Sequence, residues 1–146
     1  MGKDFVIILV ENDLNHALLL IKIFRRIGFE NEILHFGNNK EVMDFLFQRG
    51  NGQRRAKDTS YLLILGISDS NEKRVIREIK QDLSLKIMPI IIIADIDNPK
   101  EMEECYELGC NIYLTKPVNY KEFVDLVSKL GLFLAIVEVP RINHEM

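Results

Sequence analysis

The chain has 146 residues, of which 47% are hydrophobic and 28% are charged, and its formal net charge is −3. This composition excludes a disordered or fibrous chain, and the slight acidity argues against nucleic acid as a partner. The length is typical of one compact domain, so a single domain over residues 1–146 is expected. Cys105 and Cys110 have neither CxxC nor zinc-site spacing, and we interpret both as buried cytosolic thiols.

The apolar segments near the two ends of the chain are short. The run before Glu11 has about six residues, too few for the apolar part of a signal peptide. The run that ends at Glu138 has about eight, whereas a membrane span needs about 20. The sequence therefore predicts a cytoplasmic protein that does not act at a membrane.

Five short apolar segments predict strands, and segments of helical period lie between them. The predicted strands are Phe5–Val10, Glu32–Phe36, Tyr61–Leu65, Ile90–Ile93 and Asn111–Leu114. Continuous apolar runs such as VIILV and IIII are typical of strands that are covered on both faces, as in a parallel sheet. The intervening segments repeat apolar residues every three or four positions, which favours amphipathic helices.

An Asn-x-x-Glu pattern marks the predicted start of three of these helices. The asparagine side chain can accept from a first-turn backbone N–H, while the glutamate reaches back toward the cap. The pattern occurs at Asn38/Glu41, Asn98/Glu101 and Asn119/Glu122. Predicted helix ends are marked by Gly28, Gly50 and Gly109, because glycine readily takes the left-handed conformation of a C-terminal cap.

Five strand–helix units with short connections predict an α/β, doubly wound (βα)5 fold with a parallel five-stranded sheet. In such sheets the functional crevice lies at the carboxyl ends of the strands. The segments expected there are Glu11-Asn12-Asp13, Gly66, Ala94-Asp95 and Lys116-Pro117.

Three motifs suggest a family. They are VEND at residues 10–13, Pro89 ahead of the IIII strand, and ELGCNIYLTKPVNYKEF at residues 107–123. With them the chain resembles the receiver domain of two-component response regulators, most of all the stand-alone group associated with phytochrome-type kinases. The resemblance covers about residues 5–130, which we take as the core; residues 131–140 are expected to form an apolar helical extension.

The resemblance implies a flavodoxin-like receiver fold whose five parallel strands have the order 2-1-3-4-5. It also implies a role in phosphorelay signal transduction, without enzymatic activity, beside a histidine kinase or a downstream signalling protein. Receivers take a phosphoryl group on an aspartate after the third strand, hold Mg²⁺ with acids after the first, and use a hydroxyl residue and a lysine after the fourth and fifth. When these roles are carried onto this sequence, the phosphoacceptor position is Gly66. Asn12 stands in place of a metal-binding aspartate, and Ala94 stands in place of the hydroxyl residue. The pocket residues that keep the family's types are Glu11, Tyr113, Lys116 and Pro117.

These departures predict a degenerate pseudo-receiver that accepts no phosphoryl group and acts through protein–protein interaction. No cofactor is expected, and Mg²⁺ is not expected to bind tightly, with Glu11 and Asp13 as weak candidate ligands. Asp13 is alternatively the N-cap of the first helix. Lys116 is expected to pair mainly with Glu11, and Asp13 or Asp95 could also face it.

Two alternatives remain open. In one, a displaced carboxylate, Asp69 or Asp95, takes the phosphoryl group; otherwise Asp69 or Ser70 caps the third helix and Asp95 is a solvated loop acid. In the other, the emptied crevice senses a small ligand, because Gly66 and Ala94 leave room beside Lys116.

The last part of the chain is more apolar than a surface helix should be, since residues 132–137 read LFLAIV. We therefore expect a homodimer through the face of the fourth helix, fifth strand and fifth helix together with the C-terminal segment. The residues assigned to this dimer and output face are Phe123, Leu130, Phe133, Ile136 and Val137. The alternative is a tail that folds back on its own domain.

Overall fold

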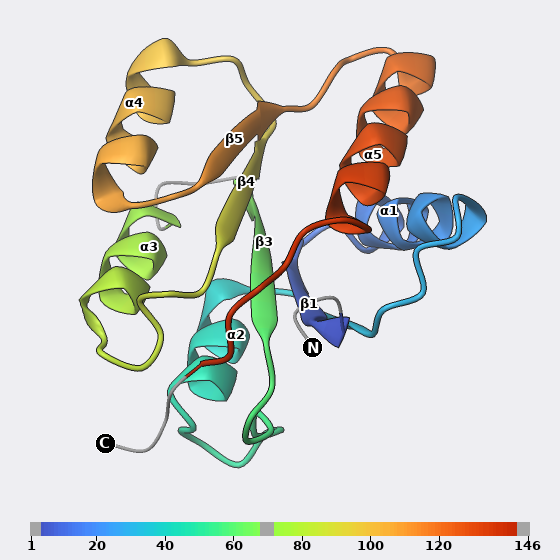
Figure 1. Ribbon diagram of the computed structural model, residues 1–146. Coiled ribbons are helices and arrows are strands. Elements are labelled where there is room, and N and C mark those ends of the chain that lie inside the picture. The colour runs from blue at the N-terminus through green and yellow to red at the C-terminus, as the bar shows by residue number, and fades with distance from the viewer. Residues whose placement is uncertain (1–3, 68–71, 143–146) are drawn as a thin grey trace.

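Five parallel strands lie between two layers of helices in the computed structural model, which describes residues 4–67 and 72–142 (Figure 1). The strands are β1 (Val6–Val10), β2 (Ile33–Phe36), β3 (Tyr61–Ile67), β4 (Ile90–Ala94) and β5 (Ile112–Thr115). The helices are α1 (Leu14–Arg26), α2 (Asn39–Leu46), α3 (Glu72–Gln81), α4 (Pro99–Leu108) and α5 (Tyr120–Leu134). The strand order β2-β1-β3-β4-β5 confirms the predicted doubly wound sheet.

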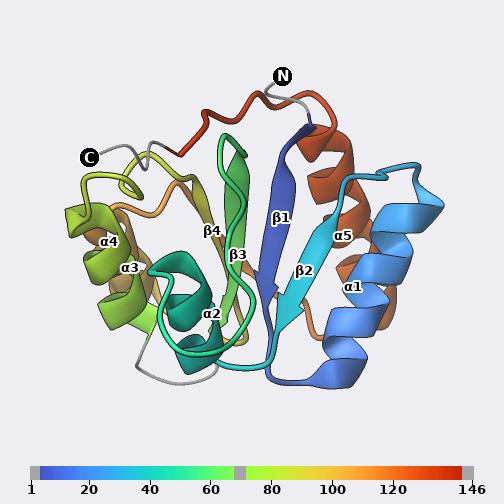
Figure 2. The ribbon, with the colours of Figure 1, turned by 90° about the horizontal axis from the view of Figure 1, so that it is seen from below.

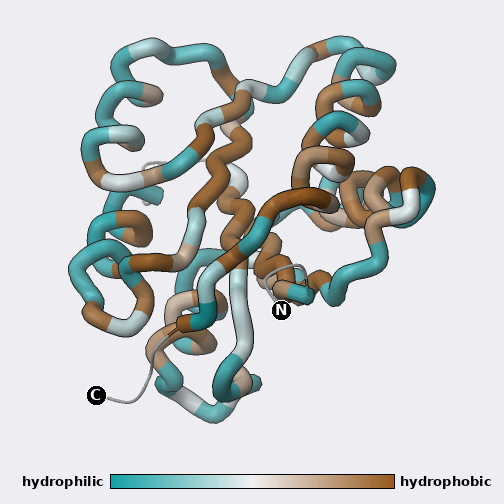
Figure 3. Tube along the Cα trace, viewed as in Figure 1, coloured by the Kyte–Doolittle hydropathy of each residue, from teal (hydrophilic) through white to brown (hydrophobic). Residues whose placement is uncertain are grey.

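The strands are continuously apolar because helices cover both faces of the sheet. Helices α1 and α5 lie on one face, and α2, α3 and α4 lie on the other (Figure 2). Successive side chains of a strand point to opposite faces, so Ile7 and Leu9 pack under α1 and α5 while Ile8 and Val10 pack on the other side. Figure 3 shows this as an apolar sheet surrounded by helices whose outer turns are hydrophilic.

The predicted N-terminal caps are present. The side chains of Asn38, Asn98 and Asn119 accept from the N–H groups of Glu41, Glu101 and Glu122 at 2.9, 3.2 and 3.1 Å. At the other ends the prediction is confirmed for Gly109, the left-handed C-cap of α4 with φ 117°. Gly50 is also left-handed, with φ 71°, but it does not mark the end of α2, which lies four residues earlier at Leu46.

The chain after α5 leaves the helix and crosses the amino ends of the strands. We call residues 135–142 the strap; Figures 1 and 2 show it running from the end of α5 across the sheet. Its residues Val139 and Ile142 are buried, the first in the core under α1 and α5 and the second in the core on the opposite face. One segment therefore closes both cores at this edge.

The predicted helical extension over residues 131–140 is wrong beyond Leu134. An extended strap can reach the cores on both faces of the sheet, whereas a continued helix would keep its apolar side chains on one side. An antiparallel bridge between Arg141 and Ser60 holds the strap next to the start of β3. The tail thus folds back on its own domain, and the core is not limited to residues 5–130.

Cys105 and Cys110 are free and buried, as the sequence predicts. Burial raises the pKa of each thiol to about 11, so both are protonated near neutral pH. None of the helices in residues 4–67 and 72–142 combines the length and the apolar character that crossing a membrane requires.

The strap should contribute to stability through its buried side chains. We expect Ile142→Ala to lower the free energy of unfolding by about 2–3 kcal/mol, because it leaves a cavity in the core. Ile136→Ala is the matched control: Ile136 is 71% exposed, and its loss should cost less than about 0.5 kcal/mol. Urea denaturation measures both, and equal effects would contradict a docked strap.

Candidate functional site

Three charged side chains from different strand ends meet at the carboxyl edge of the sheet. Glu11 follows β1, Asp95 follows β4 and Lys116 follows β5. The Lys116 Nζ lies 3.0 Å from Glu11 Oε1 and 3.0 Å from Asp95 Oδ1. The structure thus joins Lys116 to the expected Glu11, and it also makes Asp95 a partner instead of a fully solvated loop acid.

The pair between Glu11 and Lys116 is nearly buried. Their side chains are 11% and 13% exposed, whereas that of Asp95 is 48% exposed. Burial lowers the pKa of Lys116, but its hydrogen bonds with Asp95 and Glu11 outweigh that effect and raise the pKa above the usual value. Lys116 is held in place because its N–H donates to the Ala94 carbonyl at 2.7 Å, which extends the pairing of β4 and β5.

Both carboxylate oxygens and the carbonyl oxygen of Glu11 have polar partners. One carboxylate oxygen binds Lys116, and the other, Oε2, accepts from the Asp13 N–H at 3.0 Å. The Glu11 carbonyl oxygen lies 2.8 Å from His35 Nε2 on β2. Side chain and main chain are therefore held in one arrangement.

Asp13 is the N-cap of α1. Its Oδ1 accepts from the N–H groups of Asn15 at 2.9 Å and His16 at 3.2 Å. His16 also lies beside the crevice, with its Nδ1 3.4 Å from Lys116 Nζ. Among the two roles considered for Asp13, the geometry supports the cap.

Gly66 lies within β3, paired with Ile93 of β4, and the strand runs one residue further. A Cβ atom added at Gly66 would lie 3.0 Å from the Val10 carbonyl oxygen and 3.1 Å from Glu11 Oε1. These distances are tighter than ordinary contact. The Glu11 carboxylate therefore lies against the place from which a side chain at position 66 would grow.

The other predicted site residues differ in how exposed they are. Ala94 is buried, Pro117 is half-buried and Asn12 is exposed. Tyr113 is half-buried against the core under α2, α3 and α4; burial raises the pKa of its phenol to about 12. Asp69 lies outside the described residues, as does Ser70.

The open volume of the crevice is not beside Lys116. The pocket there, between Glu11, Gly66 and Lys116, measures about 10 Å³, which is room for about one water molecule. A larger pocket of about 80 Å³ lies next to Gly66, and its lining includes Asn12 and Glu72 but not Lys116. The expected room beside Lys116 is therefore wrong, and the space lies elsewhere.

Glu72 is the residue that sequence reasoning missed at this site. It is the first residue of α3 and is only 3% exposed. The sequence gives one usable signal, an acid in the first turn of the helix after β3, which must begin at the carboxyl edge of the sheet.

The assigned dimer and output face divides into buried and exposed residues. Phe123 and Leu130 are buried in the core under α1 and α5, so their assignment to a surface is wrong. They face the sheet because they lie on the inner stripe of α5. Phe133 and Ile136 are 44% and 71% exposed, and Val137 is half-buried.

Comparisons with known proteins agree with this architecture, although no family model matches the chain. The crystal structure of a response regulator receiver domain from Rhodospirillum rubrum is 32% identical, with a TM-score of 0.86 and coverage of 94% of this chain and 99% of that one. Response regulator Rcp1 of Synechocystis sp. is 29% identical over 136 residues, covering 92% of each chain. The Mn²⁺-bound form of Rcp1 is 26% identical with a TM-score of 0.79, over 93% of this chain and 99% of that one.

The sheet order and the strand-end crevice define a flavodoxin-like signalling fold. The chain belongs to the receiver domains of response regulators, close to the Rcp1 type. Receiver domains are generally non-enzymatic modules of two-component signal transduction.

Receivers use Mg²⁺, and the two weak candidate ligands, Glu11 and Asp13, both have other partners in this structure. Within residues 4–67 and 72–142, no group of three or more His, Cys, Asp or Glu side chains could hold a metal. Glu11 is engaged by Lys116 and by the Asp13 N–H, while the Asp13 carboxylate caps α1. Mg²⁺ needs oxygen ligands in near-octahedral geometry, and the two candidates already serve other partners.

Breaking the nearly buried pair of Glu11 and Lys116 should lower the free energy of unfolding more than breaking an exposed ion pair does. We expect Lys116→Met to lower the free energy of unfolding by about 3 kcal/mol, because it leaves Glu11 buried without its cation. The double variant Glu11→Gln/Lys116→Met should recover most of that loss. In the matched control, Lys129→Met removes the exposed partner of Asp125 and should cost less than about 1 kcal/mol.

Urea denaturation at several pH values measures this cycle. Because the folded-state pKa of Lys116 is raised, its contribution is complete below the ordinary value of 10.5 and disappears as the pH rises through the raised value. A double variant no more stable than Lys116→Met would contradict the pairing.

Proposed function

We propose that this receiver no longer accepts a phosphoryl group and that it works through protein–protein contacts. The observation that carries the proposal is Gly66, which offers no nucleophile, together with the Glu11 carboxylate that lies 3.1 Å from the position of a Cβ there. A carboxylate in that place repels both an acidic side chain and an incoming phosphoryl group. In this proposal the site has lost its acceptor, and a side chain placed at position 66 would lie in tight contact with Glu11.

The charge balance of the crevice supports the same proposal. Lys116, the cation that pairs with a phosphoryl group in receivers, is occupied by Glu11 and Asp95. Ala94 supplies no hydroxyl group to bind a phosphoryl oxygen. In this proposal the crevice therefore keeps one arrangement and needs no Mg²⁺ or other cofactor. The proposal also includes that the module catalyses no reaction and acts in the cytoplasm.

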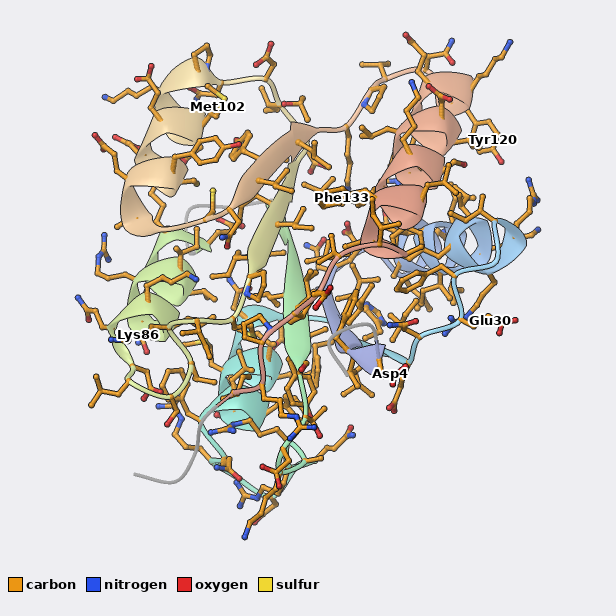
Figure 4. All side chains as sticks on the ribbon, viewed as in Figure 1. Asp4, Glu30, Lys86, Met102, Tyr120 and Phe133 are labelled. Carbon is orange, nitrogen blue, oxygen red and sulfur yellow. The ribbon has the colours of Figure 1, made fainter. Side chains whose placement is uncertain are left out.

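The partner in this proposal is a protein, such as a histidine kinase or a downstream signalling protein, with no role for nucleic acid or a membrane. The chain also forms a homodimer through the face of α4, β5 and α5 next to the strap. Exposed apolar residues support this interface: Tyr106, Leu132, Phe133 and Ile136 are 45%, 58%, 44% and 71% exposed. Figure 4 labels Phe133 near the end of α5, and Figure 3 shows an apolar stretch there.

A second candidate function is phosphotransfer to a displaced acceptor. Asp95 favours it, because its carboxylate is half-exposed and lies 3.0 Å from Lys116. Asp69, the other displaced acceptor, lies outside the described residues.

The first function predicts that acetyl phosphate with Mg²⁺ adds no phosphoryl mass to the protein. Beryllofluoride should leave the amide NMR signals near Gly66 unshifted. Intact-mass spectrometry and amide spectra measure the two outcomes. A stable phosphoryl adduct on the wild-type protein would overturn the proposal. If the Asp95→Asn variant then formed no adduct, Asp95 would be the acceptor and the second function would be supported.

Gly66→Asp alone should not restore phosphorylation, because the new carboxylate would be pressed against Glu11. The matched comparison is Gly66→Asp/Asn12→Asp/Ala94→Thr, which also returns a metal-binding acid and a hydroxyl group. Rescue by the single substitution would show that Glu11 does not block the site.

The dimer predicts a mass of twice the chain at tens of micromolar protein in size-exclusion chromatography with light scattering. Phe133→Glu should weaken dimerisation at least about tenfold, since it places a charge in an apolar interface. Leu18→Glu is the control, because Leu18 is similarly exposed at 55% but lies on α1. A wild-type monomer at this concentration excludes the dimer.

A further inference from the structure

A groove between α2 and α3 is larger than either pocket of the crevice. The two helices lie side by side on one face of the sheet (Figure 2), and the groove between them measures about 300 Å³. That volume is at the lower end of the range of small-molecule sites in proteins. None of the charged residues among its described lining belongs to a pocket of the crevice. The groove is therefore a separate concave site with room for a small organic ligand.

The floor of the groove is apolar. It is made by Met43 of α2 and Val75 of α3, which are 7% and 3% exposed and belong to the core under α2, α3 and α4. Side chains packed in a core keep their positions, so this floor is already formed before a ligand arrives. An apolar group that lay on it would lose contact with water, which favours binding.

The walls of the groove carry more positive than negative charge. The cations are Lys40, Arg49 and Arg74, and the acids are Asp44 and Glu78. Lys40 and Arg49 share one acid, because Lys40 Nζ lies 2.8 Å and Arg49 Nε lies 3.9 Å from the Asp44 carboxylate. The hydrogen bond from Lys40 lowers the pKa of Asp44, so this acid is ionised near neutral pH. Three cations and two acids leave one positive charge in excess.

The two arginines keep N–H donors that the protein does not use. Arg49 is 3.9 Å from Asp44, which is longer than a hydrogen bond, and its guanidinium lies 5.2 Å from the ring centre of Phe47. Arg74 donates from Nε to Glu78 Oε2 at 2.7 Å. Within the described part of the chain its two terminal amino groups have no polar partner. A guanidinium group fits a carboxylate with two parallel hydrogen bonds.

The other classes of ligand fit these walls less well. A cationic ligand would meet three positive side chains. A divalent metal needs several oxygen ligands, and both carboxylates of the lining already have partners. A phosphate dianion is repelled by Asp44 and Glu78 more strongly than a singly charged carboxylate is.

The apolar floor decides between a free ligand and a partner protein. The carboxylate of a partner's glutamate is carried on two methylene groups, which would leave most of the floor uncovered. A free carboxylic acid with a longer apolar body covers the floor and still reaches the arginines.

We propose that the groove between α2 and α3 binds a small, free monocarboxylate with an apolar body. The carboxylate accepts hydrogen bonds from Arg49 and Arg74, and the body lies on Met43 and Val75. The inference goes beyond the proposed function, because it adds a ligand site on elements outside the crevice. It does not depend on the loss of phosphotransfer.

Amide NMR titration of the full chain with sodium hexanoate tests the proposal, with sodium chloride as the ionic-strength control. Hexanoate should give saturable shifts of the Met43, Asp44 and Val75 signals. Acetate, which has no body to cover the floor, should bind at least about tenfold more weakly. Hexylammonium has the same body and the opposite charge, and it should not shift these signals.

Two variants of exposed arginines on α3 separate the site from the net charge of the protein. Arg74→Gln should weaken hexanoate binding at least about tenfold, because it removes charged donors from the groove. Arg77→Gln removes the same charge one turn away, from an exposed residue outside the described lining, and should leave binding unchanged.

A third variant predicts a gain, which unfolding cannot produce. Glu78→Gln removes an acid from the wall and releases Arg74, so it should strengthen hexanoate binding several-fold. Glu103→Gln is its control, because it removes an exposed acid from α4, and it should have no effect.

Four results would overturn the proposal. The first is no saturable shift with hexanoate, and the second is equal binding of hexanoate by the wild type and Arg74→Gln. The third is binding of hexylammonium or inorganic phosphate at the same amides as tight as that of hexanoate. The fourth is tighter binding of Nα-acetyl-glutamate α-amide than of hexanoate, which would assign the groove to an acidic residue of a partner protein.

Discussion

The ion pair between Glu11 and Lys116 is the constraint on which the crevice depends. It joins the ends of the first and last strands across 105 positions of sequence, with both side chains nearly buried. Such a pair contributes little net stability over apolar residues, but breaking it leaves a buried charge, so it fixes one arrangement of the strand ends. Asp95 and the main-chain bond of Lys116 to Ala94 reinforce that arrangement.

The same pair depends on Gly66 for space, in addition to the absence of a nucleophile at that position. Because glycine has no Cβ, the Glu11 carboxylate can lie against β3 and still reach Lys116. The space that remains lies on the other side of Gly66, next to Asn12 and the buried Glu72. The crevice is thus divided into a small pocket at the ion pair and a larger one beside Asn12.

The strap shows that the limits of a domain depend on contacts more than on helical period. Val139 and Ile142 complete the cores on opposite faces of the sheet, although they follow the last helix. The apolar residues at the end of α5 and in the strap are therefore of two kinds, buried and exposed. Leu134, Val139 and Ile142 turn inward, while Phe133 and Ile136 remain exposed.

The sequence by itself determined the strands and most helix caps, because period, capping and turn chemistry are local. The sheet order came from the resemblance to receivers. The strand ends were less well determined, since Gly66 and Ala94 were expected after their strands and lie within β3 and β4. The sequence also placed Glu11, Gly66 and Lys116 at one edge, since parallel strands end on the same side. Only the tertiary structure decided that Asp95 joins Lys116, that Glu11 lies against Gly66, that Glu72 is buried and that the tail forms a strap. Those outcomes depend on distances between side chains far apart in the chain, which no local pattern encodes.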